Sequence, residues 1–178
     1  MPDVLKRFII ACFLCCASIL YADAQPKAVG ASFSLSGIGI TYEHVLKQDC
    51  FIKAEIRSEL GEHFLNDERL PGASLSLVSN FILKDWKSRN GNTVHAFAGP
   101  GITAGISHDF RKDFGYFYGL KGIVGIECLF ERKVSISLSL SPTIGMHMIL
   151  RDEYLEMKYY RNGLISTVIP EIGVRYIF

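Results

Sequence analysis

The sequence predicts an all-β fold, a single eight-stranded, antiparallel, up-and-down β-barrel with a polar, packed lumen. The first observation behind this is the segment Val134 to Met148, VSISLSLSPTIGMHM, in which apolar residues alternate with serine, threonine, glycine and histidine. Because successive side chains of a strand point to opposite faces, this segment has one apolar face and one small polar face. It is also long, since strands in soluble proteins average about 5 to 6 residues.

The second observation is that the same alternation recurs along the chain. The first two strands are expected over residues 29–36 and 38–45, where the apolar parity changes between Leu35 and Ile38. A two-residue hairpin at Ser36-Gly37 explains this change, and a β-bulge is the alternative. The further expected strands cover residues 50–60, 73–83, 93–107, 115–130, 134–148 and 164–178.

Turns and loops are expected between these strands, with Asn90-Gly91 as the strongest local turn signal. The last connection is expected to be either a loop or a loop flanked by strand extensions. The expected connections cover residues 46–49, 63–71, 85–92, 108–114, 131–133 and 150–163.

The third observation is a row of charges whose sign alternates on one face of residues 50–60. Charges at this spacing can pair inside a barrel, although a strand with a solvated face shows the same pattern. Taken over all strands, the charges assigned to the interior nearly cancel, as a closed and internally paired lumen requires. These inward charges are Lys53, Arg57, Lys121 and Arg175 against Glu43, Glu55, Glu59, Glu127 and Glu171.

Alternation alone does not decide which face of the barrel lies inside. An apolar exterior is favoured by the uncharged serine row at residues 135–141, by the balanced inward charges, and by strands long enough to cross a bilayer, about 9 to 11 residues. Because eight strands leave an interior that side chains can fill, the lumen is expected to be a plug of salt bridges and not a pore. The alternative is a secreted soluble barrel that binds an apolar ligand on an apolar interior.

Residues 1–24 have the pattern of a secretory signal peptide. Basic Lys6 and Arg7 precede an apolar stretch over residues 8–20, and Ala22-Asp23-Ala24 has the small-x-small form of a cleavage site. The sequence therefore predicts export through the Sec pathway, with cleavage after Ala24. A membrane anchor is the alternative interpretation, but the apolar stretch is short for one.

The expected barrel domain, residues 25–178, contains two of the five cysteines, Cys50 and Cys128. Both lie on the apolar parity of their strands, and we interpret them as small outward-facing hydrophobic residues rather than as a disulfide or a metal site. A lipoprotein acylated at Cys12 would be a further alternative to the signal peptide. The net charge of +1 offers no basic surface for nucleic acid.

The segment 122–145, GIVGIECLFERKVSISLSLSPTIG, resembles the penultimate hairpin of small outer-membrane β-barrel proteins of Bacteroidetes. Cys128 stands where that family usually has an aromatic residue, and Ser141 stands where it has a basic one. The resemblance implies an eight-stranded barrel in the outer membrane of a Gram-negative bacterium and no single activity. The residues that match the family outline are Gly125, Glu127, Phe130 and Pro142.

The chain ends on Phe178, after a strand in which apolar residues alternate with Thr167, Glu171, Gly173 and Arg175. This pattern resembles the last strand of bacterial outer-membrane barrels. The resemblance implies that the final aromatic residue is recognised by the barrel-assembly machinery. The expected partners are therefore outer-membrane lipid and that machinery, for a monomeric, porin-like barrel.

Candidate chemistry is confined to histidines expected near the outer rim: His63, His108 and His147, with Ser107 and Asp109 beside His108. A lipid A-modifying enzyme would need a serine, a base within hydrogen-bonding reach and an orienting group. These residues lack a signature spacing, and we assign no catalytic, cofactor or metal site. The predicted function is that of an outer-membrane barrel with a structural or surface-interaction role, with the lipid A-modifying enzyme and the soluble barrel as alternatives.

Overall fold

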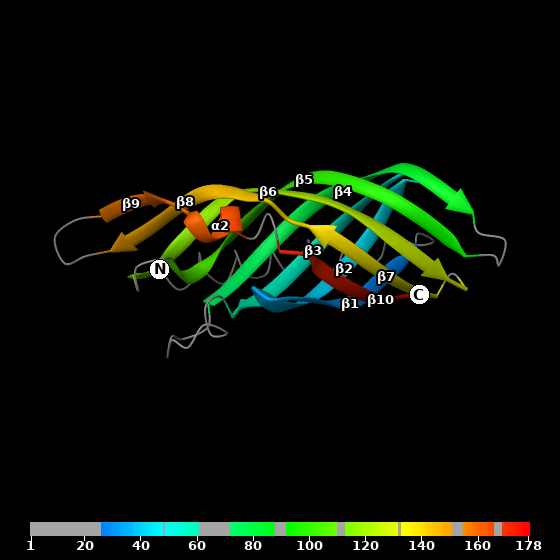
Figure 1. Cartoon of the computed structure of the whole chain (residues 1–178), viewed down its shortest axis with the longest axis horizontal. Helices are drawn as coiled ribbons and strands as arrows, with labels where there is room; N and C mark the ends of the chain where they lie inside the picture. The colour runs from blue at the N-terminus through cyan, green and yellow to red at the C-terminus, as the bar shows by residue number, and fades with distance from the viewer. Residues whose placement is uncertain are drawn as a thin grey trace, which may run out of the picture.

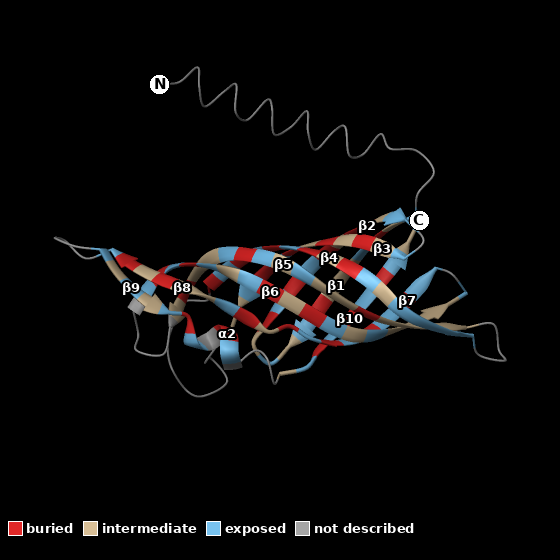
Figure 2. Cartoon of the chain, turned by 90° about the horizontal axis from the view of Figure 1, so that it is seen from above, coloured by how far each residue is buried: buried red, intermediate tan, exposed pale blue. Residues whose placement is uncertain are grey.

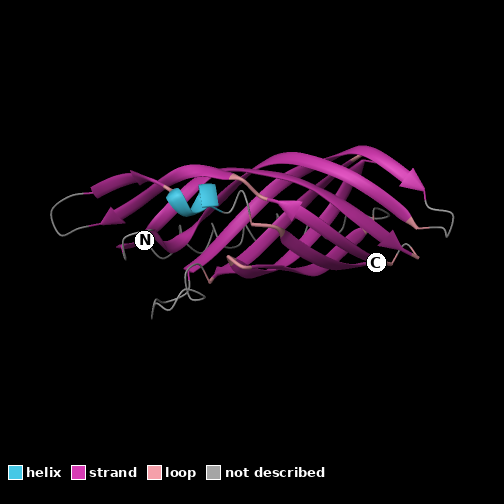
Figure 3. Cartoon of the chain, viewed as in Figure 1, coloured by secondary structure: helices cyan, strands magenta, loops and turns pink. Residues whose placement is uncertain are grey.

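The computed structural model describes residues 26–47, 49–60, 72–87, 92–109, 113–131, 133–150, 155–165 and 169–178. The expected signal peptide, the Asn90-Gly91 turn and His63 lie outside these residues. The described chain is built almost entirely of strands (Figure 3). Its elements are β1 Lys27–Ser34, β2 Gly37–Lys47, β3 Cys50–Glu59, β4 Gly72–Lys87, β5 Thr93–Asp109, β6 Asp113–Phe130, β7 Val134–Leu140, β8 Thr143–Leu150, β9 Leu155–Tyr159, α2 Arg161–Ile165 and β10 Glu171–Ile177.

The strands close into a ring (Figure 1). Hydrogen-bonded neighbours run in the order β1-β2-β3-β4-β5-β6-β7-β10, and β10 pairs with β1 to complete the circle. Each pairing is antiparallel, and the amide of Phe178 donates to the carbonyl oxygen of Lys27 at 2.8 Å. The predicted all-β fold, a closed eight-stranded antiparallel up-and-down barrel, is therefore confirmed.

Strands β7 and β8 form one long strand that is interrupted at Pro142. Leu140 lies opposite Val124 and Thr143 lies opposite Lys121, so β6 keeps a single register across the interruption. Proline has no amide hydrogen to give to the ladder, but its carbonyl oxygen still accepts from the amide of Gly122 at 2.8 Å. The long strand predicted over residues 134–148 is thus present.

The eighth strand departs from the prediction, because β9 and β10 do not form one ladder. Glu171 lies opposite Ser139 on β7, whereas Tyr159 lies opposite Met146 on β8. The chain advances seven positions from Ser139 to Met146 but twelve from Tyr159 to Glu171. The five extra residues equal the length of α2. The prediction of an unbroken strand over 164–178 is therefore wrong, and β9 confirms the loop with strand extensions. Pro170, which cannot donate to a ladder, immediately precedes β10.

The first hairpin also differs slightly from the prediction. Ser34 pairs with Gly37, so its turn is Leu35-Ser36, one residue earlier than expected. The amide of Ser36 donates to the Ser34 hydroxyl at 3.2 Å, which stabilises this turn. Gly37 belongs to the ladder, where a Cβ would come within 2.9 Å of the Arg57 side chain. Two further connections are shorter than predicted, because β4 extends to Lys87, and β5 and β6 extend over residues 108–109 and 113–114.

The two faces of the barrel differ in how far their side chains are buried (Figure 2). Buried and exposed residues alternate along the strands, as in β7, where the serines are buried and the aliphatic residues are exposed. On the β3 to β6 side of the lumen, a small apolar cluster packs inside the wall. Its members are Phe51, Val78, Phe97 and Ile123.

Glycine at inward positions makes room for the large rings of the interior. A Cβ at Gly125 would lie 2.9 Å from the Phe97 ring, and one at Gly105 would lie 2.8 Å from the Phe117 ring. Phe97 contacts Phe51 edge to face, with ring centroids 5.9 Å apart. The crowding expected of a narrow barrel is therefore relieved at glycine positions on neighbouring strands.

The apolar cluster gives a first testable prediction. Replacing Phe97 with alanine should lower the free energy of unfolding by about 3 to 5 kcal/mol, because the ring is buried and leaves a cavity. Urea titration of the purified chain measures this change. The matched control is Phe81→Ala, which removes a ring that is 46 % exposed on the outer face. Equal losses in the two variants would contradict the assignment of Phe97 to a packed interior.

Candidate functional site

The centre of the lumen is occupied by ion pairs that join strands across the ring. The Lys53 Nζ lies 3.0 Å from the Glu171 carboxylate, and the Lys121 Nζ lies 2.9 Å from the Glu55 carboxylate. Arg57 connects the two pairs, because its guanidinium binds Glu171 and lies 3.5 Å from Glu55. All five side chains are less than a tenth exposed.

The network is supplied by β3, β6 and β10, which are spaced nearly evenly around the ring. β3 lies three positions from β6 and three from β10, and β6 lies two positions from β10. Side chains that meet from such positions must cross the lumen rather than run along one wall. Burial of these charges is tolerated because each has an opposite charge in contact, and removing one partner would leave the other buried and unpaired.

A second group of charges is organised by Arg175 on β10. Its guanidinium donates to Glu43 on β2 and lies 2.9 Å from Glu127 on β6. Serine side chains of the barrel wall also donate hydrogen bonds to inward carboxylates. Ser32 donates to Glu55 at 2.5 Å, and Ser74 donates to Glu59 at 2.6 Å.

All nine charges assigned to the interior from the sequence are thus found there. Eight of them form ion pairs with one another, and Glu59 accepts the hydrogen bond from Ser74. The predicted plug of salt bridges is therefore present in the described chain. Closure of the ring brings these residues together from strands that are distant in sequence.

The outer surface of the barrel is apolar on every side. Leucine, isoleucine and valine of the outward parity are exposed along the ring, among them Ile40 and Leu120, which are 70 % and 69 % exposed. Aromatic side chains are exposed toward both ends of the strands. Those near the end that holds Lys27 and the C-terminus include Trp86, Tyr176 and Phe178, and those near the other end include Phe114, Tyr116, Tyr118 and Tyr159.

The rim histidines do not form one cluster. His147 is completely buried inside the barrel, where its Nε2 lies 3.0 Å from the carbonyl oxygen of Ser107 and its ring stacks on Tyr160 at 6.2 Å. His108, which follows Ser107 on β5, packs against Phe114 with ring centroids 5.0 Å apart. The structure therefore brings Ser107 together with His147.

This arrangement does not have the geometry of a catalytic triad. The contact to His147 comes from the main chain of Ser107, and within the described residues the Nδ1 of His147 has no hydrogen-bond partner to orient the ring. Sequence reasoning missed Tyr160, because it falls in the segment expected to be a loop. Its ring stacks on Phe117 at 4.4 Å, and both rings are buried toward this end of the lumen.

The two cysteines of the barrel are free, and each is half-buried. Cys50 lies on the face of β3 opposite the buried Phe51 and Lys53, as predicted, and its Sγ lies 3.8 Å from the Ser79 hydroxyl on the neighbouring strand. Within the part of the chain that the structure describes, no group of histidine, cysteine and acidic side chains could hold a metal ion. No described helix is long and apolar enough to cross a bilayer.

The sequence matches no protein-family model and no curated protein. The resemblance to outer-membrane barrels of Bacteroidetes therefore stays an expectation. Function has to be argued from the two features that the structure shows, the ionic interior and the apolar exterior.

The lumen network gives a second prediction. Glu171→Ala should lower the free energy of unfolding by about 3 to 5 kcal/mol, because it leaves Lys53 and Arg57 buried without their shared carboxylate. The matched control is Glu156→Ala, which breaks the partly exposed pair with Lys158 and should cost less than about 1 kcal/mol. Urea titration compares the two variants. A Glu171 variant as stable as the control would show that the network does not hold the barrel together.

Proposed function

We propose that this chain is an outer-membrane β-barrel protein with a structural or surface-interaction role and a lumen closed to solutes. The observation that carries the proposal is the inverted distribution of polarity, with ion pairs inside and aliphatic side chains outside. A bilayer favours this distribution, because hydrocarbon solvates the exterior and the closed ring satisfies the backbone of every strand.

The spacing of the aromatic residues supports the membrane setting. On β6, the exposed Tyr118 and the half-buried Phe130 share the outward parity and lie twelve residues apart, with the exposed Leu120, Val124 and Ile126 between them. At about 3.3 Å per residue and a tilt of about 45°, this separation spans about 28 Å along the barrel axis. The apolar band of known outer-membrane barrels is about 25 Å tall and is flanked by aromatic girdles. The Lys84 Nζ lies 5.4 Å from the centre of the exposed Trp86 ring, within the range of a cation–π interaction.

A soluble barrel is disfavoured by the same surface. Soluble monomers rarely expose contiguous apolar patches larger than a few hundred Å². Here exposed aliphatic or aromatic residues occur on all strands of the ring and continue from one strand to the next. The apolar ligand of a soluble barrel would also need an apolar cavity, whereas Lys53, Arg57 and Lys121 occupy the centre of this lumen.

The network supports the proposed closure to solutes. The pairs from β3 to β6 and from β3 to β10 cross the interior at its middle, and Phe117, Tyr160 and His147 pack together toward one end. Export by the predicted signal peptide, a monomeric state and assembly through the terminal Phe178 belong to the same proposal. Phe178 is exposed beside the seam where the ring closes, and it is accessible to an assembly factor there.

Fractionation tests the location. In the native host, the protein should be recovered with the outer membrane, and its gel mobility should change on boiling because a folded barrel resists detergent. Planar-bilayer recording of the purified protein should show no steady conductance. Recovery in a soluble fraction without detergent would overturn the membrane proposal, and a stable open channel would overturn the closed lumen.

Depth-dependent substitution gives a sharper test. Val124 lies halfway between Tyr118 and Phe130 on β6, and Val134 lies beside Phe130 and Tyr176; both valines are exposed. In a bilayer, Val124→Arg should cost about 2 to 4 kcal/mol of folding free energy and Val134→Arg about 0 to 1 kcal/mol. Urea titration in phospholipid vesicles measures both. In a soluble barrel both arginines would face water, and the two variants would be equally stable.

A further inference from the structure

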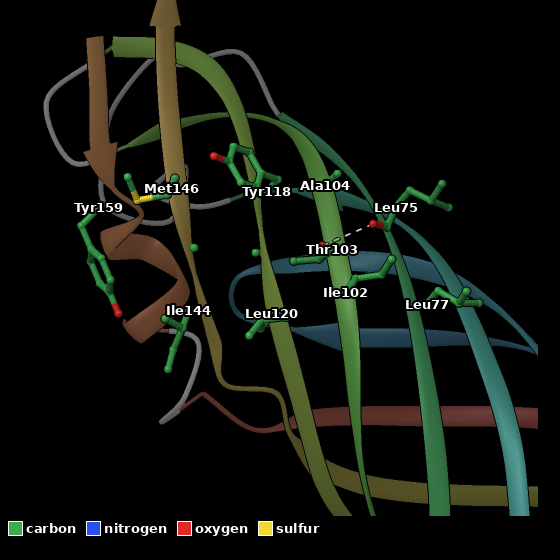
Figure 4. A pocket seen from close by; sticks show the side chains of 12 residues that line it. Leu75, Leu77, Ile102, Thr103, Ala104, Tyr118, Leu120, Ile144, Met146 and Tyr159 are labelled. Carbon is green, nitrogen blue, oxygen red and sulfur yellow. Dashed lines mark hydrogen bonds between the residues drawn. The ribbon is translucent and has the colours of Figure 1, made fainter.

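The outer face of the barrel carries a groove that crosses five strands, β4, β5, β6, β8 and β9 (Figure 4). Its walls are two rows of outward side chains that lie opposite one another across the sheet. One row is Leu77, Ile102, Leu120 and Ile144, and the other is Leu75, Ala104, Tyr118, Met146 and Tyr159.

The groove exists because a small residue interrupts one of these rows. Ala104 stands between Leu75 and Tyr118, so the second row has a gap where its neighbours are long. The resulting groove has a volume of about 770 Å³, and the backbone of Gly119 and Gly145 forms part of its lining.

The lining offers almost nothing to a polar ligand. The Thr103 hydroxyl lies on the buried side of the wall, where it accepts from Ser76 at 3.0 Å and donates to the Leu75 carbonyl oxygen at 3.3 Å (Figure 4). The phenol groups of Tyr118 and Tyr159 are the remaining side-chain polar groups of the lining. An occupant of this groove must therefore be apolar along its length.

We infer that the groove holds one acyl chain of a membrane lipid; this inference rests on the proposed function. The groove is continuous with the apolar surface that we place in the bilayer, and its volume lies within the range of about 300 to 1,000 Å³ for ligand sites. With neighbouring strands about 4.8 Å apart, its five strands span about 19 Å, a length suited to an extended acyl chain.

A flexible hydrocarbon chain also suits the shape of the groove. A void against Leu75, Leu120 and Met146 would forfeit dispersion contacts, and a chain that adjusts its torsions can restore them. The groove thus selects for a lipid that stays beside the barrel longer than the lipids around it. A second copy of the chain is the competing occupant, and the experiment below separates it by mass.

The test compares two matched alanine-to-phenylalanine variants with the wild type. Ala104→Phe fills the gap in the groove. Ala31→Phe adds the same ring to the outward face of β1, between Val174 and Ile40, on the opposite side of the ring from β5. Both positions face away from the lumen, so neither variant disturbs the ion pairs. Each protein is folded into vesicles of dimyristoyl phosphatidylglycerol, floated on a density gradient, and extracted into a mild detergent for native mass spectrometry.

Wild type and Ala31→Phe should each retain one phosphatidylglycerol, and Ala104→Phe should reduce the retained fraction about tenfold, equivalent to about 1.4 kcal/mol. Equal retention in all three proteins, or no retained lipid in the wild type, would overturn the groove and leave the membrane proposal standing. A dimer that Ala104→Phe abolishes would also overturn it, in favour of a second copy. Failure of the wild type to float with vesicles would overturn the proposed function, and the inference with it.

Discussion

The fold depends on a constraint set by the size of the ring. Eight antiparallel strands enclose an interior that is just wide enough for side chains to fill. Any charge that points inward is therefore held within reach of charges from other strands, and it must be paired. Lys53 and Arg57 satisfy that requirement by meeting Glu171 across the lumen, and Lys121 satisfies it by meeting Glu55. The small serines and glycines around them are what makes the long charged side chains fit.

Different parts of the interior are filled by different kinds of side chain. The ion pairs occupy the middle, an apolar cluster around Phe97 packs against the β3 to β6 wall, and Tyr160 stacks on Phe117 near the end that carries β9. Each region is thus filled by a different kind of contact.

The exterior is uniform in polarity but not in shape. Exposed aliphatic side chains occur on all strands of the ring, and the β4 to β9 side is hollowed at Ala104, which stands between Leu75 and Tyr118. Small residues thus have two consequences. Inside the barrel, glycines admit the aromatic rings, and outside it, Ala104 leaves a groove.

Much of this architecture was determined by the sequence alone. Period-two alternation identifies the strands and separates the two faces, since a one-residue slip would move every side chain to the wrong side. The inward charges, the outward cysteines and the closed eight-stranded ring were predictable for that reason. The five-residue excursion of α2 was not, because the alternating residues before Pro170 read as strand whether or not they join the ladder. Only the tertiary structure decided which charges pair, that His147 meets Ser107 and Tyr160 rather than His108, and that Ala104 lies in a groove. Each of these depends on the register between strands distant in sequence, which local pattern does not contain.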